Sequence, residues 1–395
     1  MKKVLIVGAG FLQRFVIQKA KAMGYYTLAV DGNPNAEGFA DADECGAVNI
    51  IDQEAVCAFA REKGVDGILT AATDYGVLAT AYTAQELGLP GLNYASAQRI
   101  KNKYETRKCL FEAGADDSAP SRFATEETDL KALAESLEYP VMVKPCDGSG
   151  SRGAARIEKS EDFPAACREA IESSLSRKAT IEPFIIGREY GVESLVVKGN
   201  IHILGVMQKE MTKPPYYAEL GHGLPSGLPE HIEQKVRTCV EKAIRALGVN
   251  HGSVNMDLLL TEKGTVHIID IGARMGGNLI GSHIIPLGTG IDYMGNMIRA
   301  AVGDPVDMTP VSAPTPVATR LLAFDRGIVK ALPDFPALEK RMGVEVRHHL
   351  ALGQTVNEYH TNLDGCGYVV ATANHIDQAA AIAEAAKNEI GNTLF

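Results

Sequence analysis

The amino-acid sequence predicts a chain of mixed α/β and α+β class, in which a doubly wound α/β domain comes first and a small α+β domain comes last. Apolar strands alternate with helices over the first 90 or so residues, which is typical of a parallel sheet covered by helices. Two apolar runs around a glycine-containing turn at 253–271 predict a hairpin. Four prolines between 305 and 316 mark a later boundary. We therefore expect domains at 1–94, 95–309 and 310–395.

The composition excludes several classes of protein. The chain has 395 residues, of which 46% are hydrophobic and 22% are charged, and its formal net charge is −10. An acidic chain has little attraction for nucleic acid or for an anionic membrane, so neither is an expected partner. The apolar run at 4–7 is too short for a signal peptide or a membrane span. Seven scattered cysteines without a CxxC pair indicate reduced thiols, no zinc site and a cytoplasmic location.

The N-terminal domain is predicted to begin with a buried strand at 2–7 that runs into the turn Gly8-Ala9-Gly10 and then into a helix. A second strand at 26–30 ends at Asp31. Two interpretations of the turn stay open. A glycine turn followed by an acidic residue about 20 positions later is typical of NAD or FAD binding, but Gln13 stands where the third glycine is expected. Alternatively, the helix N-terminus after a plain turn receives a small anionic substrate.

A helix rich in basic residues is expected at 96–113, with Ser96 as its N-cap and Gly114 just past its end. Most of its charges are expected on a solvated face. The basic residues are Arg99, Lys101, Lys103, Arg107 and Lys108.

The segment 139–154 combines a lysine with a glycine-rich loop. A short apolar strand at 141–143 delivers Lys144, and a loop of small residues at 147–153 follows at once. Glycines let consecutive backbone N–H groups approach an anion, and Arg152 adds positive charge. Because the lysine precedes the glycines and no GK[ST] closes the loop, this is not the Walker A pattern. By itself, the segment fits a phosphate site and a solvent-exposed turn equally well.

Two later segments are predicted to line a ligand site. The strand at 179–187 contains Pro183, which lacks an N–H and suits a crossing between two lobes, where the backbone of Phe184 and Ile185 could face a ligand. The stretch 211–229 is predicted to be a long loop without secondary structure, and such loops are often functional. Its polar candidates are Glu219, His222 and Ser226.

Paired carboxylates are the most informative feature of the predicted hairpin. If its loop has an even number of residues, Asp257 pairs with Ile268, and Asp270 is the diagonal neighbour of Asp257 on the same face. The two carboxylates could then share hard cations that bridge to phosphates. An odd loop would put them on opposite faces, and a solvated hairpin face is the alternative. Arg274 follows as either a salt-bridge partner or a stabiliser of charge in a transferring group.

Taken together and in this order, these features resemble the ATP-grasp superfamily of carboxylate–amine and carboxylate–thiol ligases over most of residues 1–310. The resemblance implies a Rossmann-like pre-ATP-grasp domain, a two-lobed ATP-grasp domain with a mobile lid at about 120–186, and a small C-terminal α+β domain. It also implies ATP as a ligand with Mg²⁺, or Mn²⁺, as the metal.

The resemblance implies a role for each residue that matches a family motif. The implied ATP-binding residues are Lys103, Lys144, Ser149, Gly150, Ser151, Arg152, Gly153, Glu182, Phe184, Ile185 and Glu189. Asp257 and Asp270 match the magnesium ligands, and Arg274, the implied catalytic residue beside Lys144, matches the arginine that steadies an acyl phosphate. The family often has Glu at the second metal position and Asn two residues later. Asp270 and Gly272 depart from that pattern, which predicts a weakened or rearranged magnesium site.

The long loop indicates the branch of the superfamily. Its E-x-G-H…P-S arrangement is similar to that of amino-acid and dipeptide ligases, where such residues line the acceptor site, so the implied substrate residues are Glu219, His222, Ser226 and Arg274. We expect an ADP-forming ligase that activates a small-molecule carboxylate as an acyl phosphate and joins it to an amine, in a homodimer. The alternatives are a purine-biosynthetic enzyme similar to phosphoribosylglycinamide synthetase or the phosphoribosylaminoimidazole carboxylase ATPase subunit, a non-catalytic ATP-binding protein, and a nicotinamide-dependent oxidoreductase.

Overall fold

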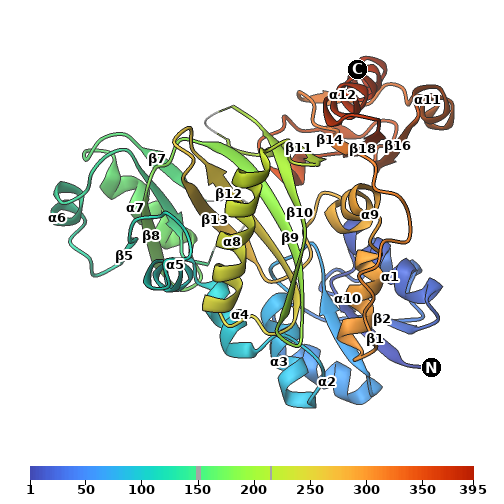
Figure 1. Cartoon of the computed structure of the whole chain (residues 1–395), viewed down its shortest axis with the longest axis horizontal. Helices are drawn as coiled ribbons and strands as arrows, with labels where there is room; N and C mark the ends of the chain where they lie inside the picture. Colours follow the sequence, from blue (N-terminus) through green and yellow to red (C-terminus); the bar gives the residue numbers. More distant parts are fainter. Residues whose placement is uncertain (148–152, 214–215) are drawn as a thin grey trace.

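The computed structural model describes residues 1–147, 153–213 and 216–395 (Figure 1). Its strands form a parallel sheet near the N-terminus, a long antiparallel sheet in the centre and a small antiparallel sheet at one end. The long central sheet contains strands from both the middle and the last part of the chain. No helix in these three ranges is both long and apolar enough to cross a lipid bilayer.

The N-terminal domain is a four-stranded parallel sheet in the order β3-β2-β1-β4, covered by helices on both faces. Apolar residues of β1 alternate between two cores: Ile6 packs with helix α1, and Leu5 packs with helix α2. The prediction of a doubly wound domain is therefore confirmed. Its elements are β1 (Lys3–Val7), α1 (Phe11–Ala22), β2 (Tyr26–Asp31), η1 (Glu37–Ala40), β3 (Glu44–Ala47), α2 (Gln53–Lys63), β4 (Gly67–Thr70) and α3 (Val77–Leu87).

The basic helix expected at 96–113 is in fact two helices, α4 (Tyr94–Lys101) and α5 (Lys103–Glu112). The break falls at Asn102, whose side chain accepts hydrogen bonds from the backbone N–H groups of Tyr104 and Glu105. An asparagine that caps a new first turn in this way ends the preceding helix. The N-cap of α4 is Asn93 rather than Ser96. The break places Lys103 at the N-terminus of its own helix.

The small lobe (residues 122–183) has an antiparallel sheet in the order β5-β8-β6-β7 and its own apolar core. Phe163 and Ile171 of α7 pack there against Val143 and Ile181 of the sheet. Among the described residues, this apolar core is separate from the other cores. Its elements are β5 (Arg122–Thr125), α6 (Leu130–Glu135), β6 (Val141–Pro145), β7 (Ala155–Ile157), α7 (Phe163–Ser173) and β8 (Lys178–Pro183).

The central sheet has eight strands in the order β13-β12-β9-β10-β11-β14-β18-β16. Helix α8 covers one face of its first half through Val236, Val240 and Ile244, and η2 and α9 connect β13 to α10, which packs toward the N-terminal domain (Figure 1). The strands are β9 (Arg188–Val197), β10 (Asn200–Met211), β11 (Glu219–Leu224), β12 (Gly252–Leu260), β13 (Val266–Gly272), β14 (Val317–Leu321), β16 (Val344–His348) and β18 (Gly367–Thr372). The helices are α8 (Glu230–Ala246), η2 (Ile280–Ile284), α9 (Ile285–Thr289) and α10 (Tyr293–Ala301).

The prediction that 211–229 lacks secondary structure is wrong for 219–224, which form strand β11. This strand pairs with β10 on one side and with β14, from the last part of the chain, on the other. Two of its six residues, Gly221 and Gly223, have low strand propensity. A Cβ at Gly221 would collide with the Thr319 carbonyl, so glycine allows the close approach of β14. Strands of the last 80 residues thus extend the central sheet.

The C-terminal part packs helices α11 (Phe335–Met342) and α12 (Ile376–Leu394) around β16 and β18. A two-stranded sheet, β15 (Gly327–Ile328) with β17 (Thr355–Val356), and the short η3 (Asn362–Asp364) complete it.

Candidate functional site

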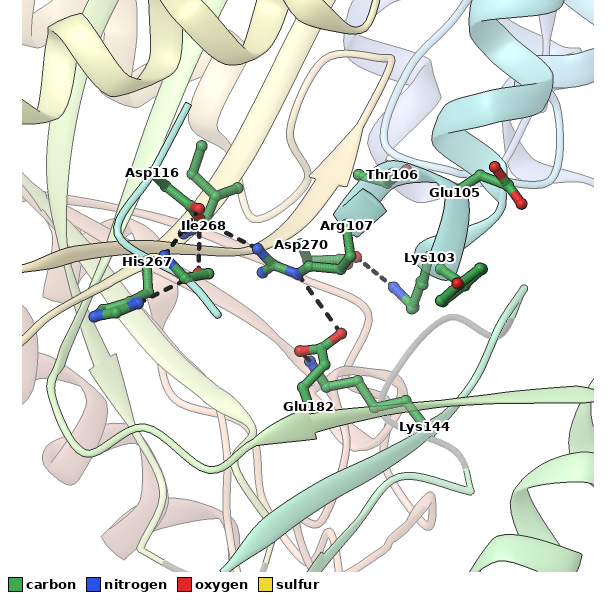
Figure 2. Close-up of polar contacts among 12 residues, drawn as sticks. Lys103, Glu105, Thr106, Arg107, Asp116, Lys144, Glu182, His267, Ile268 and Asp270 are labelled. Atoms are coloured by element: carbon green, nitrogen blue, oxygen red, sulfur yellow. Dashed lines mark hydrogen bonds and ion pairs between the residues drawn. The ribbon is translucent and has the colours of Figure 1, made fainter. Parts of the chain in front are cut away.

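A cluster of charged side chains lies where the small lobe meets the central sheet (Figure 2). Helix α5 supplies a lysine and an arginine, and the segment just after it supplies an aspartate. The small lobe supplies a lysine from β6 and a glutamate from β8, and β13 supplies a second aspartate. This inter-lobe cluster consists of Lys103, Arg107, Asp116, Lys144, Glu182 and Asp270. Four members, Lys103, Lys144, Glu182 and Asp270, were identified from the sequence as ligand residues, and the fold brings them together.

Arg107 is the centre of the inter-lobe cluster. Its guanidinium lies 3.2 Å from Asp116 and 3.6 Å from Glu182, and its side chain is only 8% exposed. Asp116 also accepts a hydrogen bond from the Ile268 backbone N–H at 2.8 Å, which ties the cluster to β13. Arg107 is therefore one of the basic residues of this region that do not lie on a solvated face.

The two lysines of the inter-lobe cluster each face a carboxylate. Lys144 Nζ lies 3.1 Å from Glu182 Oε2, and Lys103 Nζ pairs with Asp270 Oδ1. Burial would raise the pKa of Glu182, but Lys144 and Arg107 outweigh it and hold that pKa below its ordinary value. Burial lowers the pKa of Lys103, but the negative charge of Asp270 raises it by more, so the pKa of Lys103 lies above its ordinary value. Lys103 therefore carries positive charge at neutral pH.

The hairpin that carries Asp257 and Asp270 has a different register from the one expected. Leu260 pairs with Val266, so the loop has an odd length, and a bulge at Ile269 then shifts the register by one residue. Asp257 and Asp270 consequently lie directly opposite each other instead of diagonally. A bulge puts two residues of one strand against one of its partner, and here it cancels the effect of the odd loop. The two carboxylates share a face for a reason that the sequence did not reveal.

A second cluster of charges lies along the central sheet. Lys209 of β10 is 1% exposed, and its Nζ lies 2.7 Å from Glu189, 2.6 Å from Glu219 and 2.9 Å from Asp257. We name these four residues the sheet cluster. Burial lowers the pKa of Lys209, but the three carboxylates raise it well above its ordinary value. Burial raises the pKa of Asp257 to about 7, supported by repulsion from Glu219 and Glu189 and opposed by Lys209.

Lys209 was not identified from the sequence. A signal was present: it shares a strand face with Met207, which is fully buried. A lysine on a buried strand face needs acidic partners. Only the neighbours of β10 in the sheet reveal which acids those are.

The predicted substrate residues separate in the structure. The Glu219 carboxylate is occupied by Lys209, by the side-chain amide of Asn278 and, at 3.0 Å, by that of Asn362. His222 is buried beside it, with Nε2 at 4.0 Å from Glu219, and burial lowers its pKa to about 4. Ser226 donates instead to Glu233 of α8 at 2.7 Å, so its substrate role stays a prediction without a contact to the sheet cluster.

Arg274 lies in the glycine-rich turn after β13 and pairs with Asp74 of the N-terminal domain. Its Nε is 2.9 Å from Asp74 Oδ1 and its Nη2 is 3.3 Å from Oδ2. Burial lowers the pKa of Arg274, but Asp74, Glu193 and Asp270 raise it more. A Cβ at Gly272 would lie 2.9 Å from the guanidinium carbon, so glycine there leaves room for Arg274. Asp74 was missed because its partner lies 200 residues away.

The segment between the lobes was predicted to turn the backbone of Phe184 and Ile185 toward a ligand. The Phe184 N–H is used by the Pro140 carbonyl at 3.0 Å, so that group is not open to a ligand. The Arg156 guanidinium lies over the Phe184 ring at 4.1 Å, and the ring centroid of Tyr217 is 6.3 Å away. Gly153 adopts a positive φ of 68°. The remaining loop predictions, Ser149, Gly150, Ser151 and Arg152, lie outside the described residues.

Asp31, the acidic residue that follows the N-terminal glycine turn, forms hydrogen bonds within the N-terminal domain. Asp31 accepts a hydrogen bond from the Ala9 N–H at 2.9 Å and another from the Asn33 N–H at 2.8 Å. Gln13 donates to the Ala71 carbonyl at 2.6 Å, which joins the turn to the loop after β4. Asp31 thus stabilises this turn from within the domain.

The arrangement can bind a polyanion between the lobes, because cations from both sides converge there. In the described ranges, no group of three or more His, Cys, Asp or Glu side chains is arranged around a common metal position. Asp257 and Asp270 nevertheless lie opposite each other, and the sheet cluster has three carboxylates for one ammonium group, which leaves an excess of negative charge toward a cation.

Three family descriptions match successive parts of the chain. Residues 17–91 match the ATP-grasp N-terminal domain, 137–282 match the ATP-grasp domain, and 320–391 match the L-amino acid ligase C-terminal domain 2. Among curated proteins, the uncharacterized protein y4rH of Sinorhizobium fredii is 26% identical over 314 residues, which cover 78% of this chain and 64% of that protein. The chain spans about half the length of other curated relatives that it matches.

Two solved structures have the same fold over nearly the whole chain. The L-amino acid ligase from Bacillus licheniformis superposes with a TM-score of 0.83 at 23% identity, covering 98% of each chain. Phosphoribosylglycinamide synthetase from Anaerococcus prevotii gives 0.79 at 24% identity, again covering 98% of each. The family matches cover the N-terminal domain, most of the central domain and the C-terminal part, and the chain therefore belongs to the ATP-grasp superfamily.

Proposed function

We propose that the chain is an ATP-dependent carboxylate–amine ligase that joins the carboxylate of an amino acid or small peptide to an amine, with ADP and phosphate as products. One observation carries the proposal: Lys103 and Lys144, which come from opposite sides of the lobe boundary, meet Asp270 and Glu182 in one cluster. The match of 320–391 to an L-amino acid ligase domain supports this branch.

In the proposed complex, ATP lies between the small lobe and the central sheet. Lys103 and Lys144 exchange their carboxylate partners for phosphate oxygens, and Glu182 with the Ile185 backbone holds the adenine edge. Glu189 at the end of the sheet cluster holds the ribose hydroxyls. Positioning and charge neutralisation of this kind are the main demands of phosphoryl transfer.

The metal would be held by Asp257 and Asp270, whose opposed carboxylates fit a hard cation that prefers oxygen ligands. Mg²⁺ bound there would neutralise negative charge on the phosphates of ATP. Gly272 offers no side-chain ligand, so the chain provides fewer donors for a second ion than the usual family pattern.

The proposed reaction has two steps. A substrate carboxylate oxygen attacks the γ-phosphorus, the bond from that phosphorus to the bridging oxygen of ADP breaks, and an acyl phosphate forms. The amine nitrogen then attacks the acyl carbon, the carbon–oxygen bond to phosphate breaks, and the amine loses a proton to solvent. Arg274 stabilises the negative charge of the acyl phosphate, and Asp74 holds its guanidinium in the side-on geometry seen in the structure.

Release of phosphate from Mg-ATP across a panel of amino acids, singly and in pairs, tests the proposal. Stimulation by at least one amino acid or pair is expected, and Lys144→Ala and Asp270→Ala should each abolish it. Unchanged turnover in either variant would remove that residue from the mechanism. The predicted homodimer is checked separately by light scattering of the purified protein.

A purine-biosynthetic enzyme acting on a ribonucleotide is the second candidate, supported by the fold likeness to phosphoribosylglycinamide synthetase. Stimulation only by aminoimidazole ribonucleotide in the same assay would favour it. Nucleotide binding without turnover would favour a non-catalytic protein. The nicotinamide alternative has less support, because the Asp31 carboxylate is already bonded to the backbone of Ala9 and Asn33.

A further inference from the structure

Glu193 of β9 is a fully buried carboxylate that has no part in the mechanism above. Its Oε1 accepts hydrogen bonds from the Gly276 backbone N–H at 3.0 Å and from the Tyr293 hydroxyl. Its Oε2 accepts one from the Asn255 side-chain amide at 2.9 Å. Three donors from three different segments therefore converge on one side chain.

Gly276 belongs to the turn that carries Arg274, two residues earlier. A Cβ at Gly276 would lie 2.9 Å from both Asn255 Nδ2 and Glu193 Oε2, so the backbone approaches the carboxylate as closely as only glycine permits. On its other side the turn is tied to the N-terminal domain, where the Ala72 N–H donates to the Met275 carbonyl at 3.0 Å. Glu193 and Ala72 together hold the turn from opposite sides.

We infer that Glu193 is a positioning residue for the reaction, because its bond to the Gly276 N–H holds the turn that presents Arg274 beside Asp74. The inference rests on the proposed function. Glu193 is fully buried and acts through the turn instead of touching the substrate. Since Glu182, Lys103 and Lys144 lie on other elements, loss of this bond should disturb the step that needs Arg274 and leave ATP binding intact.

Two substitutions of Glu193 test the length of its side chain and its carboxyl group separately. Glu193→Asp keeps the carboxyl group but withdraws it by one methylene from the Gly276 N–H. Glu193→Gln keeps the length and an acceptor oxygen for that N–H, with Asn255 free to reorient its amide. Ser194→Ala is the matched control: Ser194 is the next residue of β9, fully buried, and points to the other face of the sheet.

Hydrogen exchange of the Gly276 amide, measured by mass spectrometry without substrate, reads the geometry directly. We expect about tenfold faster exchange in Glu193→Asp, close to wild-type exchange in Glu193→Gln and no change in Ser194→Ala. In the phosphate-release assay, kcat of Glu193→Asp should fall about tenfold with KM for ATP within about threefold of wild type, and Glu193→Gln should recover most of kcat. If the Asp variant does not fold, Tyr293→Phe, which removes one donor, should shift both readouts in the same direction by about threefold.

Unchanged exchange in Glu193→Asp would overturn the inference, as would faster exchange with wild-type kcat, or an equal loss of ATP affinity and kcat. A wild-type protein that turns over no carboxylate–amine pair would refute the proposed function. That failure is distinguishable, because the exchange measurement needs no turnover.

Discussion

The inter-lobe cluster and the sheet cluster are both built from lysines and carboxylates, yet they differ in exposure and in the number of partners. In the inter-lobe cluster Lys103 is 21% exposed and its partner Asp270 is 49% exposed. In the sheet cluster Lys209 is 1% exposed and has three carboxylates around it. One cluster joins two lobes, and the other joins neighbouring strands of a single sheet.

The difference separates replaceable charge pairs from permanent ones. A partly exposed pair contributes about 0–1 kcal/mol, so a lysine there can exchange a carboxylate for a phosphate at little cost. A buried lysine cannot lose its partners without leaving an uncompensated charge in a low dielectric. We therefore expect substitution of Lys103 to change activity more than stability, and substitution of Lys209 to change stability more than activity.

The largest effect is expected from Lys209→Met. Removal of the ammonium group leaves Glu189, Glu219 and Asp257 facing one another, and breaking a buried ion pair in this way costs about 3–5 kcal/mol. Urea unfolding should show a correspondingly lower free energy of unfolding. Arg245→Met, which removes an exposed ion pair with Glu241 on α8, is the control and should cost less than about 1 kcal/mol. Equal losses in the two variants would erase the contrast between the clusters.

Lys103→Met should show the opposite balance. Loss of a charged group that neutralises phosphate should lower turnover about 10²–10³-fold, while the free energy of unfolding changes by less than about 1 kcal/mol. Phosphate release and urea unfolding measure the two quantities on the same preparation. Lys108→Met, an exposed position of the same helix, serves as the control and should keep wild-type turnover. A Lys103 variant that unfolds as readily as Lys209→Met would contradict the distinction.

The sheet cluster should also make stability depend on pH through His222. Burial lowers its pKa from 6.5 to about 4, so the folded protein keeps this ring neutral while the unfolded chain protonates it. The resulting stability is fully present above pH 6.5 and is lost as the pH falls to about 4, by on the order of 3 kcal/mol. Unfolding free energies measured between pH 7 and 4 should fall less steeply in His222→Gln. An identical slope in both proteins would exclude His222 as the cause.

The smallest change in stability is expected at Asn362, which contacts the sheet cluster through Glu219. Asn362→Ala removes the hydrogen bond to the Glu219 carboxylate and the two that Asn362 Oδ1 accepts, from the Glu219 N–H and the Tyr359 hydroxyl. These groups are partly exposed and the carboxylate keeps Lys209 and Asn278 as partners, so a loss of about 1 kcal/mol is expected. Thermal unfolding detects a change of this size, and Asn392→Ala at an exposed position of α12 should cause none. A loss of stability as large as that of Lys209→Met would mean that Asn362 stabilises the sheet cluster as much as Lys209 does.

Local patterns were sufficient for some residues of the site and insufficient for others. Lys144 and Glu182 lie on strands with clear apolar flanks, so their place at the lobe boundary could be predicted. Arg107 could not, because the helix break at Asn102 depends on one side-chain cap within an otherwise continuous helical pattern. The pairing of Asp257 with Asp270 was expected for the wrong reason, since an odd loop and a bulge have cancelling effects on register.

The sequence by itself determined the order of the domains, the parallel N-terminal sheet, the central hairpin and the chemical types of the candidate ligands. These features follow from the periodicity of apolar residues and from glycines and prolines that mark turns and the ends of elements, and both signals extend over only a few residues. Only the tertiary structure decided that Glu219–Leu224 is a strand, that Lys209 has three acidic partners and that Arg274 meets Asp74. Each of these contacts joins segments distant in the chain, and the energy of a buried charge or a strand pair depends on a neighbour that no local pattern names.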